Sequence, residues 1–378
     1  MRKTMLFPLL FSVLGLISCQ SGQSASSLEA EETTISDMIG REIKIRPGTY
    51  KRVVCIGAGA LRMYSYIGDI NLLAGVEDID NESLETRPTL FDKVARPYVL
   101  QNADAFKTLP SCGVGGPQAQ AAEAEKILSC DPDIVISFYE DADKEEALQK
   151  QLGVPVVTLR QGGDGIFSDL TLDSLTLLGK VFGKEKRSQE LVYFIQAEID
   201  SLKQATASLS SDKKAYICGL GNWGTTNQFM TAQNYATFES AHISNVVSGL
   251  AKDGIQAIDE EKFVSLAPSM DTMIFDAAAI KNIKGTGYDF SLCKAFQTGE
   301  VYLQMAYNAY YTNLEISLCN AWFDAKAVYG EELDVDIEAK ADEITEMFNG
   351  SKLYGKIKEC PFSFGGYQRI DNPTEFFK

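Results

Sequence analysis

One eight-residue pattern occurs twice in the chain and constrains the fold more than any other feature. Glu125-Lys-Ile-Leu-Ser-Cys-Asp-Pro132 and Glu261-Lys-Phe-Val-Ser-Leu-Ala-Pro268 carry Glu, Lys, Ser and Pro at the same offsets, 136 positions apart (125 to 261). An apolar, strand-like run follows each copy, at 134–138 and 272–275. The repeat predicts two lobes of similar build, each with a glutamate opening a short helix before a buried strand. Two such lobes would enclose a ligand cleft.

The N-terminus is predicted to be a targeting segment and a tether. Two basic residues precede an apolar run, 5–17, which is too short to span a bilayer. The run ends at Cys19 in a sequence that resembles a bacterial lipobox, in which Cys19 would be acylated. We therefore expect a signal peptide at 1–18 and a lipidated, flexible tether at 19–35, with a lipid anchor as the only membrane attachment. An ordinary cleaved signal is the alternative.

Composition narrows the class of protein. The chain beyond the tether, roughly 340 residues, exceeds the usual size of one core and predicts two domains. A net charge of −17 argues against a nucleic-acid partner and against docking on anionic lipid. Seven cysteines remain after Cys19 and none forms a Cys-x-x-Cys pair, so a structural zinc site is not indicated. The sequence favours small buried side chains for them.

Short apolar runs alternate with helical patterns in both halves, which predicts an α/β fold with parallel sheets covered by helices. The expected strands are 52–56, 72–76, 134–138, 154–159, 215–220, 272–275 and 301–305.

The segment between the halves, 166–208, shows helical patterns only. Apolar residues at helical spacing, from Leu191 to Leu202, predict a helix of about 23 residues that starts near Glu185. We expect this helix to join two Rossmann-like lobes, 36–165 and 209–378, as a rigid strut. A surface helix of one lobe is the alternative.

A glycine-rich turn follows the first expected strand. Gly57-Ala-Gly-Ala-Leu-Arg62, with Glu77 twenty residues after the first glycine, mimics a dinucleotide-binding fingerprint. Arg62 stands where a small residue should allow close helix packing, so dinucleotide binding is not favoured. The turn is instead expected to present backbone N–H groups to another ligand.

Candidate ligand-binding residues follow the expected strands, where ligands bind in α/β sheets. They are Arg62, Arg96, Tyr98, Tyr139, Arg160, Trp223, Tyr307 and Tyr310. The arginines suit carboxylate, catecholate, hydroxamate or phosphate groups. Tyr307 and Tyr310 share helical spacing with Leu314, which predicts an aromatic helix face in the cleft wall or, alternatively, in the core. The single histidine, His242, does not favour a His-rich metal site or a Ser-His-Asp hydrolase.

Several motifs occur in one order along the chain. They include Asp37-Met-Ile-Gly-Arg41, Arg96-Pro-Tyr98, Glu125 with Pro132-Asp133, the segment 178–187, and Tyr307 to Glu315. Over residues 37–365 the chain resembles the substrate-binding lipoproteins of bacterial ABC importers for iron complexes and cobalamin, the class with a rigid helix between its lobes. In that family one glutamate per lobe docks on arginines of the permease, and Glu125 and Glu261 match these positions.

The resemblance implies a monomeric, non-enzymatic receptor without a cofactor of its own. It would capture an iron or cobalt chelate (ferric-siderophore, haem or corrinoid-like) and deliver it to an ABC permease dimer with a cytoplasmic ATPase. The expected location is the cell envelope, either the periplasm or the outer face of the cytoplasmic membrane. A receptor for bare ferric iron, another metal or an oxyanion remains an alternative, as does a metal-dependent enzyme on the same scaffold.

Overall fold

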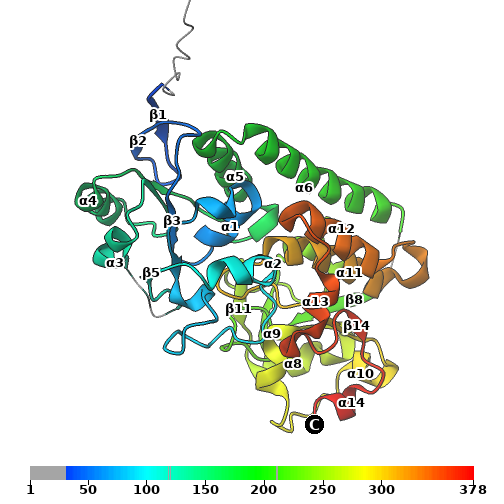
Figure 1. Ribbon diagram of the computed structural model, residues 1–378. Helices are drawn as coiled ribbons and strands as arrows, with labels where there is room; N and C mark the ends of the chain where they lie inside the picture. The colour runs from blue at the N-terminus through cyan, green and yellow to red at the C-terminus, as the bar shows by residue number, and fades with distance from the viewer. Residues whose placement is uncertain (1–30, 118, 120, 210–211) are drawn as a thin grey trace, which may run out of the picture.

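Two separate, mainly parallel β-sheets organise the computed structural model of the chain (Figure 1). The structure describes residues 31–117, 119, 121–209 and 212–378. The predicted signal peptide and Cys19 lie outside these residues. No helix within them is long and apolar enough to cross a bilayer.

The N-terminal part (31–167) is built on the parallel sheet β3-β6-β7, which β4 and β5 accompany as a second parallel pair. Its strands are β1 (Thr33–Ser36), β2 (Glu42–Ile45), β3 (Val53–Ile56), β4 (Val76–Glu77), β5 (Ser111–Gly113), β6 (Ile134–Ser137) and β7 (Val156–Thr158). Its helices are α1 (Ala60–Ile67), α2 (Pro97–Phe106), α3 (Ala124–Ser129) and α4 (Ala142–Leu152), with single 3₁₀ turns at Ile70–Leu72, Asp78–Asp80 and Gly165–Phe167.

The C-terminal part (212–378) is built on a five-stranded sheet of order β10-β8-β12-β13-β14, in which only β14 is antiparallel to its neighbour. Its strands are β8 (Lys214–Cys218), β9 (Met230–Ala232), β10 (Ser244–Asn245), β11 (Ile255–Ala257), β12 (Thr272–Asp276), β13 (Val301–Gln304) and β14 (Gln368–Arg369). Its helices are α7 (Ala236–Ser240), α8 (Glu260–Leu266), α9 (Ala277–Ile283), α10 (Lys294–Thr298), α11 (Leu314–Tyr329), α12 (Ile337–Asn349), α13 (Tyr354–Glu359) and α14 (Pro373–Phe376).

Two helices connect the parts. Helix α5 (Asp169–Phe182) ends at Gly183, whose left-handed φ of 61° closes the helix, and α6 (Glu185–Thr206) then begins where the sequence predicts it. Helix α6 packs against α5 on one side and against α11 and α12 on the other, and it runs along one flank of the molecule (Figure 1). Leu191, Ile195 and Leu202 form its buried stripe.

One hydrophobic core joins the two parts. It contains strand residues of both sheets, such as Val53 and Ile217, together with much of α11. A buried polar contact reinforces this junction, because the Tyr66 hydroxyl donates to Glu315 Oε2 over 2.6 Å. The candidate cleft therefore lies between two closely packed parts.

The repeated pattern folds as expected in both parts. Each copy forms a short helix, α3 and α8, followed by a fully buried parallel strand, β6 and β12. Ser129 Oγ donates to the Lys126 carbonyl over 2.6 Å, and Ser265 Oγ donates to the Lys262 carbonyl over 2.7 Å. The two copies are thus alike at the level of single hydrogen bonds.

Two sequence-based expectations about elements are wrong. The run 72–76 is mostly not a strand, since a 3₁₀ turn ends at Leu72 and β4 starts only at Val76. Residues 307–313 form an irregular loop instead of a helix. Tyr310 and Tyr311 have left-handed φ values of 55° and 69°, and Asn308 pairs with Thr312 across the loop. Short strands such as β9 and β11 were not expected.

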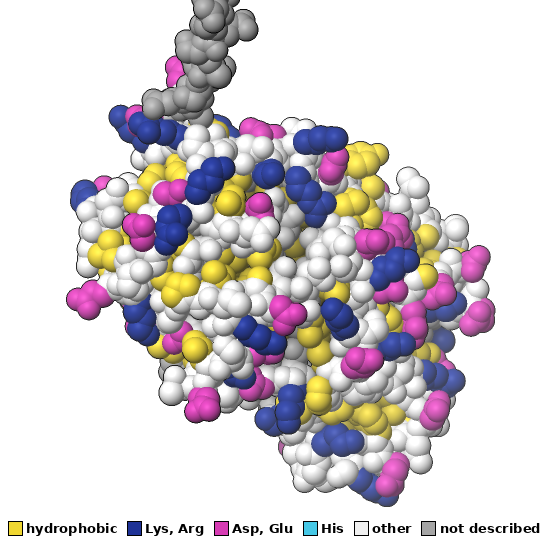
Figure 2. All heavy atoms as spheres, viewed as in Figure 1, with side chains coloured by type: hydrophobic (Ala, Val, Ile, Leu, Met, Phe, Trp, Pro, Cys, Tyr) yellow, Lys and Arg dark blue, Asp and Glu magenta, His cyan; other side chains and the backbone are white. Residues whose placement is uncertain are grey.

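Charged side chains are mixed on the visible face. Figure 2 shows acidic and basic groups interspersed there, without one continuous basic patch.

Candidate functional site

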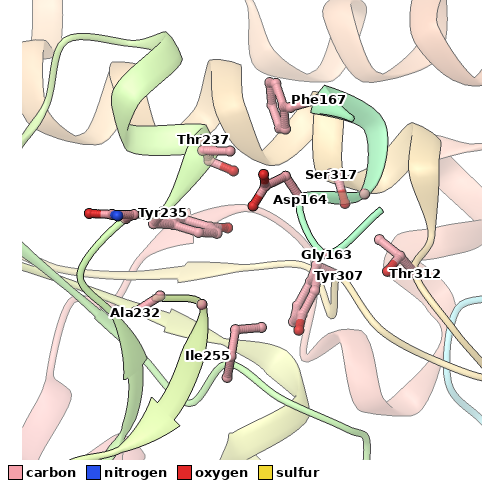
Figure 3. A pocket seen from close by; sticks show the side chains of 14 residues that line it. Gly163, Asp164, Phe167, Ala232, Tyr235, Thr237, Ile255, Tyr307, Thr312 and Ser317 are labelled. Atoms are coloured by element: carbon pink, nitrogen blue, oxygen red, sulfur yellow. The ribbon is translucent and has the colours of Figure 1, made fainter. Parts of the chain in front are cut away.

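A cavity of 280 Å³ lies between the N-terminal and C-terminal parts. The N-terminal part supplies the loop after β7, including Asp164, and the C-terminal part supplies the region of β9, α7 and β11 and the loop before α11. The residues that line the cavity are Gly163, Asp164, Gly165, Phe167, Ala232, Asn234, Tyr235, Ala236, Thr237, Gly254, Ile255, Tyr307, Thr312 and Ser317. We call this cavity the interlobe pocket (Figure 3).

A glycine allows the two walls to approach each other. Gly165 has a φ of 57°, and a Cβ added there would lie 3.0 Å from Thr312 Cγ2. A side chain at this position would therefore strain the backbone and press against the opposite wall. The loop after β7 needs this glycine to reach the loop before α11.

Polar groups face the interior of the interlobe pocket. Figure 3 shows the Asp164 carboxylate, the Tyr235 phenol and the Thr237 hydroxyl directed toward one another, with Tyr307 below them in this view. Asp164 is exposed, so its charge stands at the solvent side of the pocket. The hydroxyls can donate or accept hydrogen bonds, while the carboxylate only accepts.

A buried polar cluster lies behind this wall. Asp276, at the end of β12, accepts hydrogen bonds from Gln304 Nε2 at 2.9 Å and from the backbone N–H of Tyr307 at 3.2 Å. Burial raises the pKa of Asp276 to about 7. Asp324 on α11 is also fully buried, and neither of its carboxylate oxygens has a partner within the described chain. Burial, with the charge of Asp276 as the smaller cause, raises the pKa of Asp324 well above its usual range.

The loop before α11 is held by Arg62 from α1. Its guanidinium donates to the carbonyl oxygens of Ala309, Tyr310 and Thr312 at 2.7, 3.0 and 2.8 Å. It also donates to Asn313 Oδ1 at 2.9 Å. Arg62 is 1% exposed and does not line the interlobe pocket. Its contacts instead fix the loop that forms one wall of the pocket.

Tyr310 crosses from the C-terminal part into the N-terminal part. Its hydroxyl donates to Glu77 Oε2 over 2.7 Å and accepts the Gly116 N–H over 3.0 Å. Glu77 Oε1 accepts the Gly57 N–H over 3.0 Å, so this N–H of the glycine-rich turn is not free for a ligand. Burial raises the pKa of Glu77 to about 7.

Three more predicted ligand residues are buried in contacts within the chain. Arg96 pairs with Asp80, which also accepts the Tyr98 hydroxyl over 2.7 Å. The Trp223 indole N–H donates to the Leu90 carbonyl over 3.0 Å. None of these three lines the interlobe pocket, and a ligand role for them stays a prediction.

The remaining candidates occupy different surroundings. Tyr307 lines the interlobe pocket. Tyr139 is half-buried and lines a separate cavity of 340 Å³ between α4 and the segment before α3. Arg160 forms a half-exposed ion pair with Glu140 over 2.8 Å. The structure thus brings only one of the eight predicted residues into the interlobe pocket.

Sequence reasoning missed most of the residues that line the interlobe pocket. Asp164 lies in Gly162-Gly-Asp-Gly165, and such a turn directly after an expected strand was an available signal. Tyr235 and Thr237 flank the start of α7, a five-residue helix with no marked sequence pattern. Their position depends on the tertiary fold.

The two predicted docking glutamates lie on the surface, one in each part. Glu125 on α3 and Glu261 on α8 are exposed, and neither carboxylate has a partner in the part of the chain that the structure describes. Three residues further along each helix an aliphatic side chain is exposed: Leu128 by 43% and Val264 by 40%. Residues three apart share a helix face, so each acid stands beside an apolar side chain.

A metal site of the kind that sulfur, imidazole and carboxylate ligands form is not present among the described residues, because no three such side chains converge there. The seven cysteines are all described and all free, and only Cys360 is not buried. This agrees with the expectation of small buried side chains.

Comparisons with known proteins match this architecture. A family model described as periplasmic binding protein matches residues 91–290. A periplasmic solute-binding protein from Veillonella parvula superposes with a TM-score of 0.67 and 16% identity, covering 92% of this chain and all of that one. An ABC transporter solute-binding protein from Sulfurospirillum deleyianum gives a TM-score of 0.60 and 19% identity, covering 86% and 97% of the two chains.

A third solved structure has a ligand. The molybdate periplasmic binding protein MolA of a Haemophilus influenzae ABC transporter, bound to molybdate, gives a TM-score of 0.62 and 17% identity, covering 85% of this chain and 98% of its own. Identities this low establish the fold alone. Comparison with curated protein sequences gave no significant match.

The family match spans more than half of the chain. The chain therefore belongs to the periplasmic binding protein family. Members of this family are extracytoplasmic solute-binding proteins that deliver small-molecule ligands to ABC permeases. The predicted α/β architecture with parallel sheets is confirmed.

Proposed function

We propose that this protein captures a metal complex in the interlobe pocket and delivers it to an ABC permease dimer, without performing catalysis. The interlobe pocket carries the proposal, because residues of both parts meet there around a cavity in a family of solute-binding proteins. We propose lipid attachment through Cys19, which would place the described body next to a membrane permease.

The size of the interlobe pocket favours a compact ligand. Its 280 Å³ lies just below the range of about 300–1,000 Å³ that is typical of small-molecule sites. A haem or a ferric siderophore would require the walls to separate further than in this structure. A small iron or cobalt complex is therefore the form of the predicted chelate that these walls accommodate best.

Delivery is proposed to use the two repeated helices. Glu125 and Glu261 are exposed, lie in corresponding helices of the two parts and leave their carboxylates available for a basic partner. A dimeric permease with one basic socket per subunit would contact one glutamate in each part. Leu128 and Val264 would add an apolar contact at each socket.

Two experiments test the two halves of the proposal. Metal analysis of the protein purified from its host, followed by thermal-shift screening of metal complexes, tests capture; a ligand at 100 times its dissociation constant adds about 2.7 kcal/mol of stability. Uptake in cells that produce the Glu125→Lys/Glu261→Lys variant tests delivery. We expect loss of uptake with unchanged ligand affinity, whereas normal uptake would exclude these glutamates as the docking groups.

A receptor for bare ferric iron is a second candidate, because Asp164, Tyr235 and Tyr307 bring one carboxylate and two phenols to one cavity. Carboxylate and phenolate oxygens are hard ligands that suit ferric iron. Burial raises the pKa of Tyr235 and Tyr307, so a bound ion would have to displace their protons. A phenolate-to-iron charge-transfer band after ferric loading would favour this candidate over a complex that keeps its own ligands.

A further inference from the structure

The arginines that the sequence offers for an anionic ligand are engaged within the chain. Arg62 donates four hydrogen bonds to the loop before α11, and Arg96 pairs with Asp80 in the interior. Arg160 pairs with Glu140. Arg62 and Arg96 are buried and already paired, and neither lines the interlobe pocket. An anionic ligand would therefore need positively charged groups other than these arginines.

The described lining of the interlobe pocket contains no positively charged side chain. No lysine, arginine or histidine is present among the described residues that line it, and its one charged group is Asp164. The other polar groups are hydroxyls and the Asn234 amide, which adapt to either kind of partner. The local charge that a solute meets is therefore negative.

Two buried carboxyl groups lie behind the wall of the pocket and add no positive charge to it. Asp276 and Asp324 are fully buried behind Tyr307 and Tyr235, and the oxygens of Asp324 have no partner in the described chain. Gln304 Oε1 is a further buried acceptor that has no donor among the described residues. Burial raises the pKa of both carboxyls, which favours their neutral form, so the charge that a solute meets in the pocket is set by Asp164.

From this arrangement we infer that the interlobe pocket selects compact cationic solutes, and specifically positively charged metal complexes whose outer ligands donate hydrogen bonds. The inference rests on the proposed function and names the ligand class within it. It departs from the expectation that arginines bind acidic groups of the ligand. It also separates this pocket from that of the molybdate-bound relative, whose ligand is an oxyanion.

The test compares two inert octahedral complexes of the same metal. Hexaamminecobalt(III) is a trication with outward N–H donors, and hexacyanocobaltate(III) is a trianion with outward acceptors. Binding of each, and of molybdate, to the purified protein is measured by isothermal titration calorimetry at constant ionic strength. The Asp164→Asn variant removes the charge of the pocket, and Asp334→Asn removes an exposed charge outside it as the matched control.

We expect hexaamminecobalt(III) to bind with one-to-one stoichiometry and the two anions not to bind. Asp164→Asn should weaken the binding about tenfold, as expected for the loss of one charge at a partly exposed site, and Asp334→Asn should leave it unchanged. The control matters because a chain of net charge −17 attracts any trication.

Equal weakening by both substitutions would overturn the inference, because the binding would then reflect overall charge. Binding of molybdate or hexacyanocobaltate(III) in preference to the trication would also overturn it while leaving the receptor function intact. The receptor function itself is judged separately, by the uptake of the Glu125→Lys/Glu261→Lys variant.

Discussion

Replacement of Arg62 by methionine tests whether this arginine holds the fold together. The substitution keeps the aliphatic stem but removes hydrogen bonds to three carbonyl oxygens and to Asn313 Oδ1, all in a buried site. Hydrogen bonds from a charged donor contribute about 1.5–3 kcal/mol each, and a buried acceptor left without a donor costs about 1–3 kcal/mol. Because these contributions are not additive, we expect a loss of about 4 kcal/mol in the free energy of unfolding.

The measurement is urea unfolding followed by circular dichroism, with the free energy taken from linear extrapolation. Arg160→Met is the control, since the side chain of this arginine forms only a half-exposed pair with Glu140. Exposed pairs contribute about 0–1 kcal/mol, so the control should be nearly neutral.

Equal, small effects of both substitutions would refute the reasoning. The carbonyls of the loop before α11 would then be hydrated or repaired by other donors, and Arg62 would be free for a ligand. A large effect at Arg62 alone would show that the arginine shapes the interlobe pocket indirectly, by fixing the loop that carries Tyr307 and Thr312.

Three further perturbations have defined outcomes. Burial raises the pKa of Glu77 from 4.5 to about 7. The contribution of Glu77 to the free energy of unfolding is therefore greatest below pH 4.5 and falls by about 3 kcal/mol as the pH rises through 7. Urea unfolding of Glu77→Gln at several pH values should show a flatter profile in this range. The double variant Leu128→Asn/Val264→Asn should reduce uptake several-fold without changing the melting temperature. The control Leu292→Asn, at another exposed leucine, should change neither uptake nor the melting temperature. Tyr66→Phe removes the hydroxyl that donates to the buried Glu315 Oε2 over 2.6 Å. The free energy of unfolding from denaturant titration should fall by about 2 kcal/mol. An unchanged value would mean that water replaces the hydroxyl.

The regular parts of the fold were predictable because local pattern and burial agree there. Strands such as β6 and β12 are short apolar runs with turn residues on both sides, and the repeated helices before them start with acidic residues. Helix α6 has its apolar stripe and begins after a glycine. The short strands β9 and β11 escape such reasoning, because a three-residue strand has too little periodicity to stand out.

The tyrosine-rich segment shows where spacing misleads. Tyr307 and Tyr310 have the spacing of a helix face. Arg62, however, donates to three carbonyls of this segment, and Asn308 pairs with Thr312. These carbonyls accept hydrogen bonds from a guanidinium about 250 positions away in the sequence, and these bonds fix their direction. Only tertiary contacts decide this conformation, and a single-sequence pattern does not contain them.

The same argument explains why the arginines that the sequence offered for acidic groups of a ligand do not line the interlobe pocket. An arginine after a strand is a good anion receptor only if its guanidinium remains unpaired at the end of folding. Arg62 closes the junction between the two parts, where buried carbonyls of the loop before α11 need donors, while Arg96 pairs with Asp80 inside the N-terminal part. The charge left in the lining of the interlobe pocket is then that of Asp164, and our proposal of a cationic ligand follows from this residue rather than from the arginines near the strand ends.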